Sequence, residues 1–533
     1  MVNRIGAVNR IVIGVTAGAA LAACGPAAGG GTTGPSPEPS PVPAPMEYVP
    51  LTSTLPPIPD VDAALAIRVI EPTQGAPRPA SDSTFIYGSV GTGDAALLVN
   101  GTQVPVAPNG AFIAFQPVPA DGAWRLEAFK GRQRAEATIT YRAASAASET
   151  NSSAARTATL PEGAFSAPRA GVVVGGAETL ATGSDAVYAR PTPTGTYRWF
   201  FPRGARLTLV ERRRAQYRVQ LDTGSAWIDT TAVRVEGAPA PSASRGAATV
   251  RAAAGGAELR IPAGFAPFLV EVRGNDVNVT VYRDAPATVQ AAQDDFVRGA
   301  TAAASETGGA GQVSVALARA PWGYMATYEA DGTLLVRIRR PPAIDAANPL
   351  RGMRIVIDPG HPPAGATGPT GYREKDANLA ISLPLAEKLR ARGAEVIMTR
   401  TEDVPVELAP RTQLAVDRDA HLLVSVHNNA FGEGQNPFRS QHTSTYYFQP
   451  WSQPLAAALN REIAAVVGIP NRGAMWGNLA LVRPTWMPST LTESLFMPIP
   501  EQENALRDPG FLDRLADAHV RGIEAFLREA AAR

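Results

Sequence analysis

The stretch that decides the fold is Arg354-Ile355-Val356-Ile357-Asp358-Pro359-Gly360-His361. Its first four residues form a largely apolar run, as expected of a strand in a parallel sheet whose two faces are both covered. Further strands are predicted at 395–398 and 422–426. Apolar residues recur at helical spacing between and after them, at Leu379, Leu383, Ala386 and Leu389, then over 455–466 and 511–526. Strands that alternate with helices predict a doubly wound α/β domain over residues 349–531.

Residues that can bind a metal follow these strands. His361 and His427 each come after an apolar run, Glu493 ends another, and Glu374 follows a Gly-rich loop. Because the carboxyl ends of parallel strands meet at one edge of an open sheet, these side chains can converge there. Two imidazoles and one carboxylate form the first shell of a catalytic zinc site, and a second carboxylate can take the proton from a water. The pattern predicts a metal-dependent hydrolase with Zn²⁺ as its cofactor.

Several spaced motifs follow one order in the last third of the chain. They are Ile-Asp-Pro-Gly-His361, Gly-Tyr-Arg-Glu374-Lys-Asp, Met-Thr-Arg400, Leu408-x-x-Arg411, Ser-Val-His427-Asn-Asn, Asn471-Arg472-Gly473 and Thr-Glu493. This order resembles the zinc-dependent N-acetylmuramoyl-L-alanine amidases of the Amidase_3 class. The resemblance implies a phosphorylase/hydrolase-like α/β fold, with His361, Glu374 and His427 as zinc ligands and Glu493 as the catalytic carboxylate. It also implies peptidoglycan as the substrate, cut between the lactyl group of N-acetylmuramic acid and L-alanine.

The sequence departs from the family pattern after the first histidine, where Pro362-Pro363 replace the usual Gly-Gly. Proline has a fixed φ and no N–H, so this loop is expected to be stiffer and to donate fewer hydrogen bonds. Residues 430–443 are too short for the inhibitory helix of some relatives. An open site is therefore expected, with Glu433 as the residue that would otherwise cover the metal.

Two other functions stay open at this point. One is a zinc peptidase that cuts another cell-wall amide, since the same set of two histidines and one carboxylate is also used for peptide hydrolysis. The other is a non-catalytic lipoprotein that binds the cell wall, although the presence of all four site residues argues against it. The sequence does not identify an activator protein.

Polar residues near the motifs have structural explanations. Asp358 is expected to orient His361 or to cap its loop, and Ser425 has no base partner that would indicate a serine hydrolase. Asn428 and Asn429 are expected to donate hydrogen bonds in the site. Three histidines are expected to be structural or surface residues: His421, His442 and His519.

The first residues have the pattern of an export signal. Arg4 and Arg10 precede an apolar run over 11–20, which is shorter than the roughly 20 residues of a spanning helix. The run ends in Leu21-Ala22-Ala23-Cys24-Gly25, which resembles the lipobox of bacterial lipoproteins and contains the only cysteine. We expect a lipoprotein signal peptide over residues 1–24, a lipid anchor on Cys24, and a periplasm-facing location at the cell envelope. The outer membrane is favoured if there is one, because no Asp follows Cys24.

The rest of the chain is predicted to be multidomain. Residues 25–57 are rich in Gly, Ala, Ser, Thr and Pro, which predicts a disordered tether. Three small mostly-β domains are expected next. They resemble an immunoglobulin-like sandwich (62–142), a Src-homology-3-like barrel with Trp227 in its core (160–236), and the amidase N-terminal module (248–342). A net charge of +1 gives no reason to invoke nucleic acid.

Overall fold

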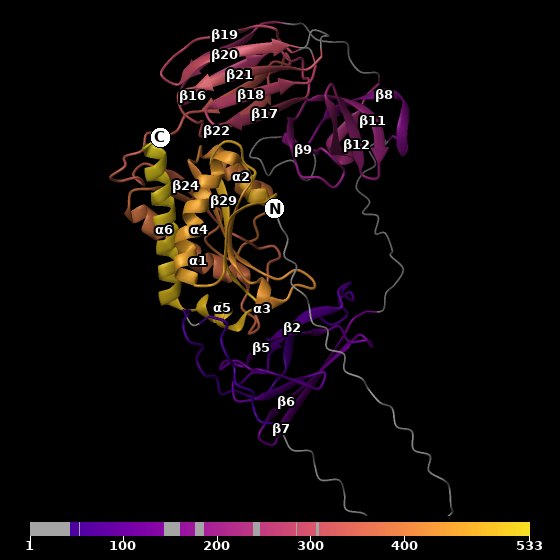
Figure 1. Ribbon diagram of the computed structural model, residues 1–533, viewed down its shortest axis with the longest axis vertical. Coiled ribbons are helices and arrows are strands. Elements are labelled where there is room, and N and C mark those ends of the chain that lie inside the picture. The colour runs from indigo at the N-terminus through magenta and orange to yellow at the C-terminus, as the bar shows by residue number, and fades with distance from the viewer. Residues whose placement is uncertain are drawn as a thin grey trace, which may run out of the picture. The chain divides into compact units, whose positions relative to one another are not determined.

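The computed structural model describes residues 43–52, 54–142, 160–175, 186–237, 246–283, 285–304 and 309–533 (Figure 1). The predicted signal peptide, Cys24 and the tether up to residue 42 lie outside these residues. The part of the chain from residue 43 onward forms one unit, apart from residues 1–42. None of the helices described has the length and apolar character needed to cross a membrane.

The C-terminal region contains a six-stranded mixed sheet. Its order is β25 (Glu395–Met398), β24 (Arg354–Pro359), β26 (Leu422–Asn429), β29 (Ser489–Phe496), β27 (Thr443–Tyr447) and β28 (Asn471–Trp476). The first four strands run parallel, whereas β27 is antiparallel to β29 and parallel to β28. The carboxyl ends of β24, β26 and β29 therefore lie at the same edge.

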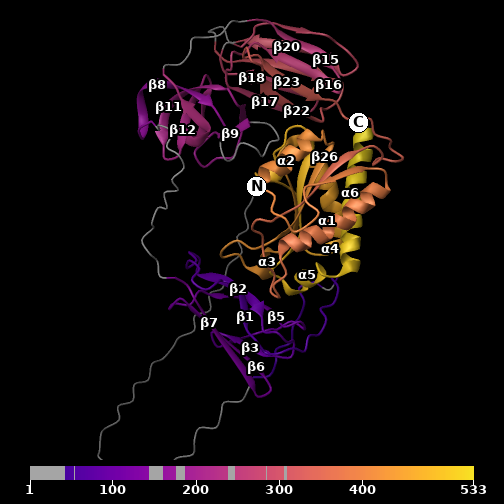
Figure 2. The same ribbon diagram turned by 180° about the vertical axis from the view of Figure 1, so that it is seen from behind.

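Helices pack against this sheet (Figures 1 and 2). Helix α1 contacts β24, β25 and β26, α4 contacts β27, β28 and β29, and α6 packs against both helices. The helices are α1 (Glu374–Ala391), α2 (Leu408–Asp417), α3 (Pro437–Ser440), α4 (Gln453–Val467), α5 (Pro500–Ala505) and α6 (Pro509–Ala531). The predicted stripe of α1 is wrong at Leu383, which is 39% exposed, and Ile381 and Leu385 are buried instead.

Residues 62–142 form two antiparallel sheets. The first has the order β1-β2-β5 and the second β4-β3-β6-β7. The strands are β1 (Arg68–Glu71), β2 (Ser83–Ser89), β3 (Ala96–Val99), β4 (Thr102–Val104), β5 (Ala111–Pro117), β6 (Ala123–Lys130) and β7 (Gln133–Thr140). Trp124, Leu126 and Phe112 are buried in a core of their own, so this part, called the β-sandwich below, has its own hydrophobic centre.

The next region is a seven-stranded sheet of order β10-β9-β13-β12-β11-β8-β14. Its strands are β8 (Gly163–Val173), β9 (Ala186–Arg190), β10 (Trp199–Pro202), β11 (Arg206–Arg213), β12 (Gln216–Leu221), β13 (Gly224–Asp229) and β14 (Val233–Val235). Trp227 is 8% exposed, in agreement with a structural role.

The third β region has two sheets, of order β19-β15-β16-β23-β22 and β17-β18-β21-β20. Its strands are β15 (Ala248–Ala253), β16 (Gly256–Ile261), β17 (Phe268–Arg273), β18 (Asp276–Val281), β19 (Val289–Ala291), β20 (Val297–Ala304), β21 (Gly311–Leu317), β22 (Gly323–Tyr328) and β23 (Leu334–Arg339). A large β-rich region thus precedes the α/β region, as predicted, and the division into separate domains stays a prediction.

The segment before the β-sandwich departs from the predicted tether. The backbone N–H of Leu51 donates to Oε1 of Glu501 at 2.7 Å, and the hydroxyl of Tyr48 donates to the same carboxylate. Leu55 is 7% exposed and belongs to the core of the α/β region. Composition averaged over the whole stretch predicted disorder, but Tyr48 and Leu55 are enough to attach its last residues to the folded domain.

A buried histidine makes this fold sensitive to acid. His519 on α6 is fully buried; its Nδ1–H donates to Leu515 O at 2.8 Å and its Nε2 lies 3.2 Å from Thr492 Oγ1. Burial lowers the pKa of His519 to about 4. An unfolded histidine has a pKa of about 6.5, so protons bind the unfolded chain more tightly and stability falls as the pH drops from about 6.5 to about 4.

We expect His519→Gln to remove up to about 3 kcal/mol of this pH-dependent loss, as the difference between the unfolded pKa of about 6.5 and the folded pKa of about 4 implies. The measurement is chemical denaturation of wild type and variant at about pH 7 and about pH 4. Burial also lowers the pKa of His421 to about 4, so His421 contributes to the loss of stability at low pH that remains in the variant. The same loss of stability in both proteins would show that His519 is not responsible.

Candidate metal centre

Four predicted site residues lie at the carboxyl edge of the sheet. His361 follows β24, His427 is in β26, Glu493 is in β29, and Glu374 is the first residue of α1. The strands are neighbours in parallel register, with His427 beside Glu493. His361, just after β24, and Glu493, in β29, are more than 130 positions apart in the chain, and the sheet brings them to the same edge.

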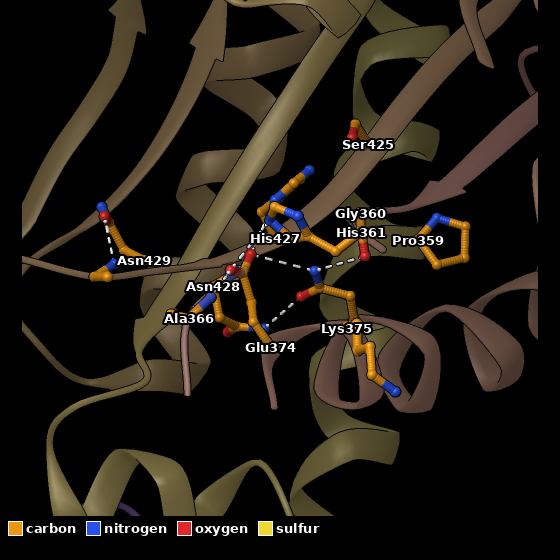
Figure 3. A network of polar contacts seen from close by, with 12 residues as sticks. Pro359, Gly360, His361, Ala366, Glu374, Lys375, Ser425, His427, Asn428 and Asn429 are labelled. Atoms are coloured by element: carbon orange, nitrogen blue, oxygen red, sulfur yellow. Dashed lines mark hydrogen bonds and ion pairs between the residues drawn. The ribbon is translucent and has the colours of Figure 1, made fainter. Parts of the chain in front are cut away.

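Three of these side chains converge in a group that is suited to a metal ion (Figure 3). One ligand atom from each of His361, Glu374 and His427 lies within 4.8 Å of the others. Nε2 of His361 is 3.2 Å from Oε2 of Glu374, and Nδ1 of His427 is 2.9 Å from Oε1. Two nitrogens and a carboxylate are a donor set that zinc accepts.

The charge of Glu374 is stabilised despite its burial. Burial raises the pKa of this carboxyl, but hydrogen bonds from His361 and His427 and their positive charge lower it by more, so the pKa of Glu374 lies far below its ordinary value. The carboxylate is therefore ionised and available to a cation.

Glu493 lies beside this group and does not belong to it. Its Oε2 atom is buried and has no hydrogen-bond partner among the described residues. Burial, and then the negative charge of Glu374, raises the pKa of Glu493 well above its ordinary value. A buried carboxyl oxygen without a hydrogen bond costs folding free energy. Oε2 of Glu493 is therefore suited to form a hydrogen bond with a group on a bound ligand.

Asp358 and Ser425 support the loop of the first histidine. Asp358 accepts hydrogen bonds from Thr399 Oγ1 at 2.5 Å, Ser425 Oγ at 2.6 Å and Arg411 Nη1 at 2.8 Å. Both of its oxygens are thereby used within the protein. Asp358 reaches the loop of His361 only through Arg411, so its predicted role of orienting His361 or capping the loop stays a prediction, and Ser425 is a structural donor.

Two arginines hold the same loop, and their role was missed in the sequence. Buried Arg411 donates to the carbonyls of Pro359 at 2.8 Å, Pro362 at 2.9 Å and His361 at 3.2 Å. Arg400 donates to Pro359 O at 2.9 Å. Both belong to motifs quoted above, but only the folded chain shows that they bind backbone carbonyls.

Two asparagines support Glu374 through hydrogen bonds. Asn378 is one helical turn after Glu374, and its Nδ2 donates to Oε1 at 3.3 Å and to Gly360 O at 3.2 Å. Asn428 donates from Nδ2 to Asn378 Oδ1 at 3.0 Å, as expected of a donor in the site. Oδ1 of Asn429 accepts from the adjacent Ala430 N–H, and the donor role expected of its Nδ2 stays a prediction. The i, i+4 spacing from Glu374 was the available signal for Asn378.

The remaining histidines bind neighbouring groups. His421 Nδ1 accepts from Arg354 N–H at 3.0 Å, and His442 Nδ1 lies 2.7 Å from Ser440 O. Neither of them, nor Glu433, belongs to the ligand group found among the described residues. Glu433 accepts instead from the backbone N–H of Ala80, in the β-sandwich. The only helix in the 430–443 segment is the four-residue α3.

Gly360 sets the position of the second histidine. A Cβ atom at this position would lie 2.2 Å from Nε2 and Cε1 of His427. We therefore expect Gly360→Ala to displace the ring and to weaken zinc binding about 10- to 100-fold, the usual effect of disturbing the support of a ligand. Competition with a chromophoric chelator measures this affinity.

The matched control is Gly432→Ala, whose Cβ would meet no atom closer than 3.6 Å outside its chain neighbours. This variant should bind zinc as wild type does. Wild-type affinity in Gly360→Ala would mean that the ring of His427 is free to move without loss.

Known proteins resemble the C-terminal region. The sequence model of the family described as N-acetylmuramoyl-L-alanine amidase (Amidase_3) matches residues 355–525. The N-acetylmuramoyl-L-alanine amidase LytC of Bacillus subtilis (strain 168) is 32% identical over 184 residues, which are 34% of this chain and 37% of LytC. The probable cell wall amidase LytH of Staphylococcus aureus is 33% identical over 183 residues, 34% of this chain and 60% of LytH.

A solved structure is similar over the same region. The catalytic domain of CwlV, an N-acetylmuramoyl-L-alanine amidase from Bacillus (Paenibacillus) polymyxa var. colistinus, is 33% identical. It covers 33% of this chain and 98% of that domain, with a TM-score of 0.31. The chain spans less than two thirds of the length of LytC and of LytH. By its sequence, the region of residues 355–525 belongs to the N-acetylmuramoyl-L-alanine amidase family.

Proposed function

We propose that this protein is an N-acetylmuramoyl-L-alanine amidase. It hydrolyses the amide between the lactyl group of N-acetylmuramic acid and L-alanine in peptidoglycan. The observation that carries the proposal is the group of His361, Glu374 and His427, with ligand atoms within 4.8 Å, next to the unpartnered carboxyl oxygen of Glu493. The family match over residues 355–525 supports the substrate class.

His361, Glu374 and His427 would hold Zn²⁺, since two imidazoles and one carboxylate leave a position open for catalysis. When bound, zinc supplies Lewis-acid chemistry that activates water and polarises the substrate carbonyl. Asn378 keeps Glu374 in place for this role through its hydrogen bond at 3.3 Å. Such support orients a ligand and raises metal affinity.

Glu493 would act as the general base and then as the general acid. Its carboxylate takes a proton from the attacking water, whose oxygen bonds to the lactyl carbonyl carbon. As the carbon–nitrogen bond breaks, the carboxyl returns the proton to the amino nitrogen of L-alanine. A carboxyl whose pKa is raised by burial is suited to both transfers near neutral pH.

The remaining parts of the chain would place the enzyme at its substrate. The lipobox pattern supports export and a lipid anchor on Cys24 at the cell envelope, facing the periplasm. We propose that residues 62–142 are an immunoglobulin-like sandwich, 160–236 a Src-homology-3-like barrel and 248–342 an amidase N-terminal-like module. Peptidoglycan is the partner that these domains would share with the catalytic domain.

Digestion of purified peptidoglycan by the full mature chain tests this function. With zinc bound, mass spectrometry should find stem peptides with a free N-terminal L-alanine and glycan strands without peptides. A chelator should abolish these products and added zinc should restore them. Cuts within the stem would instead indicate a zinc peptidase, and zinc binding without any cleavage would indicate a wall-binding lipoprotein.

A further inference from the structure

A cavity of about 570 Å³ opens beside the candidate metal centre. His361, Glu374 and Thr367 line it from the catalytic domain, and Glu71 and Tyr141 are among the lining residues from the β-sandwich. Its volume is within the range of roughly 300–1,000 Å³ that is typical of ligand sites. A substrate that reaches the metal centre would therefore also meet the β-sandwich.

Buried contacts attach the β-sandwich to the catalytic domain at this cavity. Phe85 and Tyr87 of β2 share a hydrophobic cluster with Phe431 and Phe496 of the catalytic domain. The ring centroids of Phe85 and Phe431 are 5.9 Å apart, and those of Phe431 and Phe496 are stacked at 4.5 Å. The hydroxyl of Tyr87 donates to Thr367 O, in the loop that leads to Glu374, at 3.0 Å. These contacts keep the lining residues of β1 and β2 at the cleft.

Apart from the predicted metal ligands, the charged side chains that line this cavity are acidic. They are Glu71 of β1 and Glu433, and no Lys or Arg lines the cavity in the described part of the chain. Burial raises the pKa of the Tyr141 hydroxyl, the hydrogen bond from Trp124 and the charge of Arg78 lower it, and the charges of the two carboxylates raise it by smaller amounts. Arg78 also acts on Tyr141, but its side chain is directed to Ala120 O at 3.1 Å and does not line the cavity. The cleft is therefore suited to a cation or to hydrogen-bond donors.

Glu71 is the carboxylate that remains available to a ligand. Its Oε2 accepts only the hydroxyl of Tyr87, at 3.2 Å, among the contacts of the described residues. Burial raises the pKa of Glu71, which means that its charge is incompletely compensated within the protein. Glu433, by contrast, accepts the backbone N–H of Ala80.

We propose that the β-sandwich completes the substrate cleft and that Glu71 determines specificity by binding a cationic amino group on the substrate peptide. This inference rests on the proposed amidase function. Stem peptides carry a diamino acid, whose side-chain amine is free and cationic in an uncross-linked stem and acylated in a cross-link. Hydrogen bonds between charged partners are about twice as strong as neutral ones. Glu71 therefore favours uncross-linked stems.

The test measures binding, so that it does not depend on cleavage. The full chain with Glu493→Gln, loaded with zinc, is titrated calorimetrically with two synthetic lactyl-peptides. The probes differ only in whether the side-chain amine of the diamino acid is free or acetylated. We expect Kd to be on the order of tenfold lower for the free amine, as a single charged hydrogen bond allows. Equal Kd values, or no binding of either probe, would overturn the proposal without any further variant.

Glu71→Gln, added to the same protein, keeps an acceptor for Tyr87 and removes the charge. The two probes should then bind within about twofold of each other. The matched control is Glu136→Gln on β7, an exposed carboxylate that does not line the cavity; it should retain the preference. A preference that survives Glu71→Gln would assign the discrimination to another residue. If peptidoglycan digestion fails while the free-amine probe still binds more tightly, the proposed amidase reaction is wrong, and the proposed role of Glu71 in binding a cationic amino group is kept.

Discussion

Glu493→Gln is expected to lower kcat for amide hydrolysis by about 10²- to 10⁴-fold, the usual contribution of a general acid or base. Glutamine has nearly the same shape but cannot accept the proton of the attacking water. Zinc affinity should change little, because Glu493 does not belong to the group of His361, Glu374 and His427. Initial rates on a soluble muropeptide, together with the zinc content of the purified protein, measure both effects.

Glu395→Gln is the matched control, since this exposed residue lies on β25 in the same sheet. It should leave kcat and zinc content unchanged. A Glu493→Gln protein that loses its zinc would make Glu493 a fourth ligand. Wild-type kcat in that protein would exclude Glu493 as the base and would leave the proton transfer to another group.

Arg411→Met is expected to destabilise the catalytic domain by about 3–5 kcal/mol, the effect of breaking a buried ion pair. Arg411 is 2% exposed and pairs with the fully buried Asp358 at 2.8 Å. The substitution leaves the charge of Asp358 without its cationic partner and removes the donor of the His361 and Pro362 carbonyls. Hydrogen exchange of peptides from β24 and β26, followed by mass spectrometry, reports the free energy of opening of this region alone.

A second substitution identifies the cause. Asp358→Asn in the Arg411→Met protein removes the unpaired charge, so it should recover part of the lost stability. Arg418→Met is the control, because Arg418 is exposed at the end of the same helix; it should exchange as wild type does. Unchanged exchange in Arg411→Met would mean that the loop does not depend on this arginine.

The strands and the candidate ligands could be predicted because their signals are local. The apolar run at 354–357 is long enough to indicate a covered strand, and polar residues at the ends of parallel strands meet by geometry. The same rule brought His427 and Glu493 together. The predicted burial of Leu383 on α1 was wrong. Periodicity gives the spacing of the buried residues on a helix, but it does not fix which side of the helix faces the core.

The support of the site could not be predicted in the same way. Arg411 acts through the backbone carbonyl of Pro359, which is 52 positions away in the sequence. The attachment of the β-sandwich depends on Tyr87 and Thr367, which are 280 positions apart. Nothing in a strand pattern indicates which domain a tyrosine hydroxyl will reach, so contacts of this kind appear only in the folded chain.

A crystal structure of the zinc-loaded chain, with diffraction data on both sides of the zinc absorption edge, tests whether His361, Glu374 and His427 bind the metal. We expect one anomalous peak bound by these three residues, with the carboxyl of Glu493 facing the open side and outside bonding distance. No peak at this group, or a peak at which Glu493 closes the coordination, would contradict this expectation.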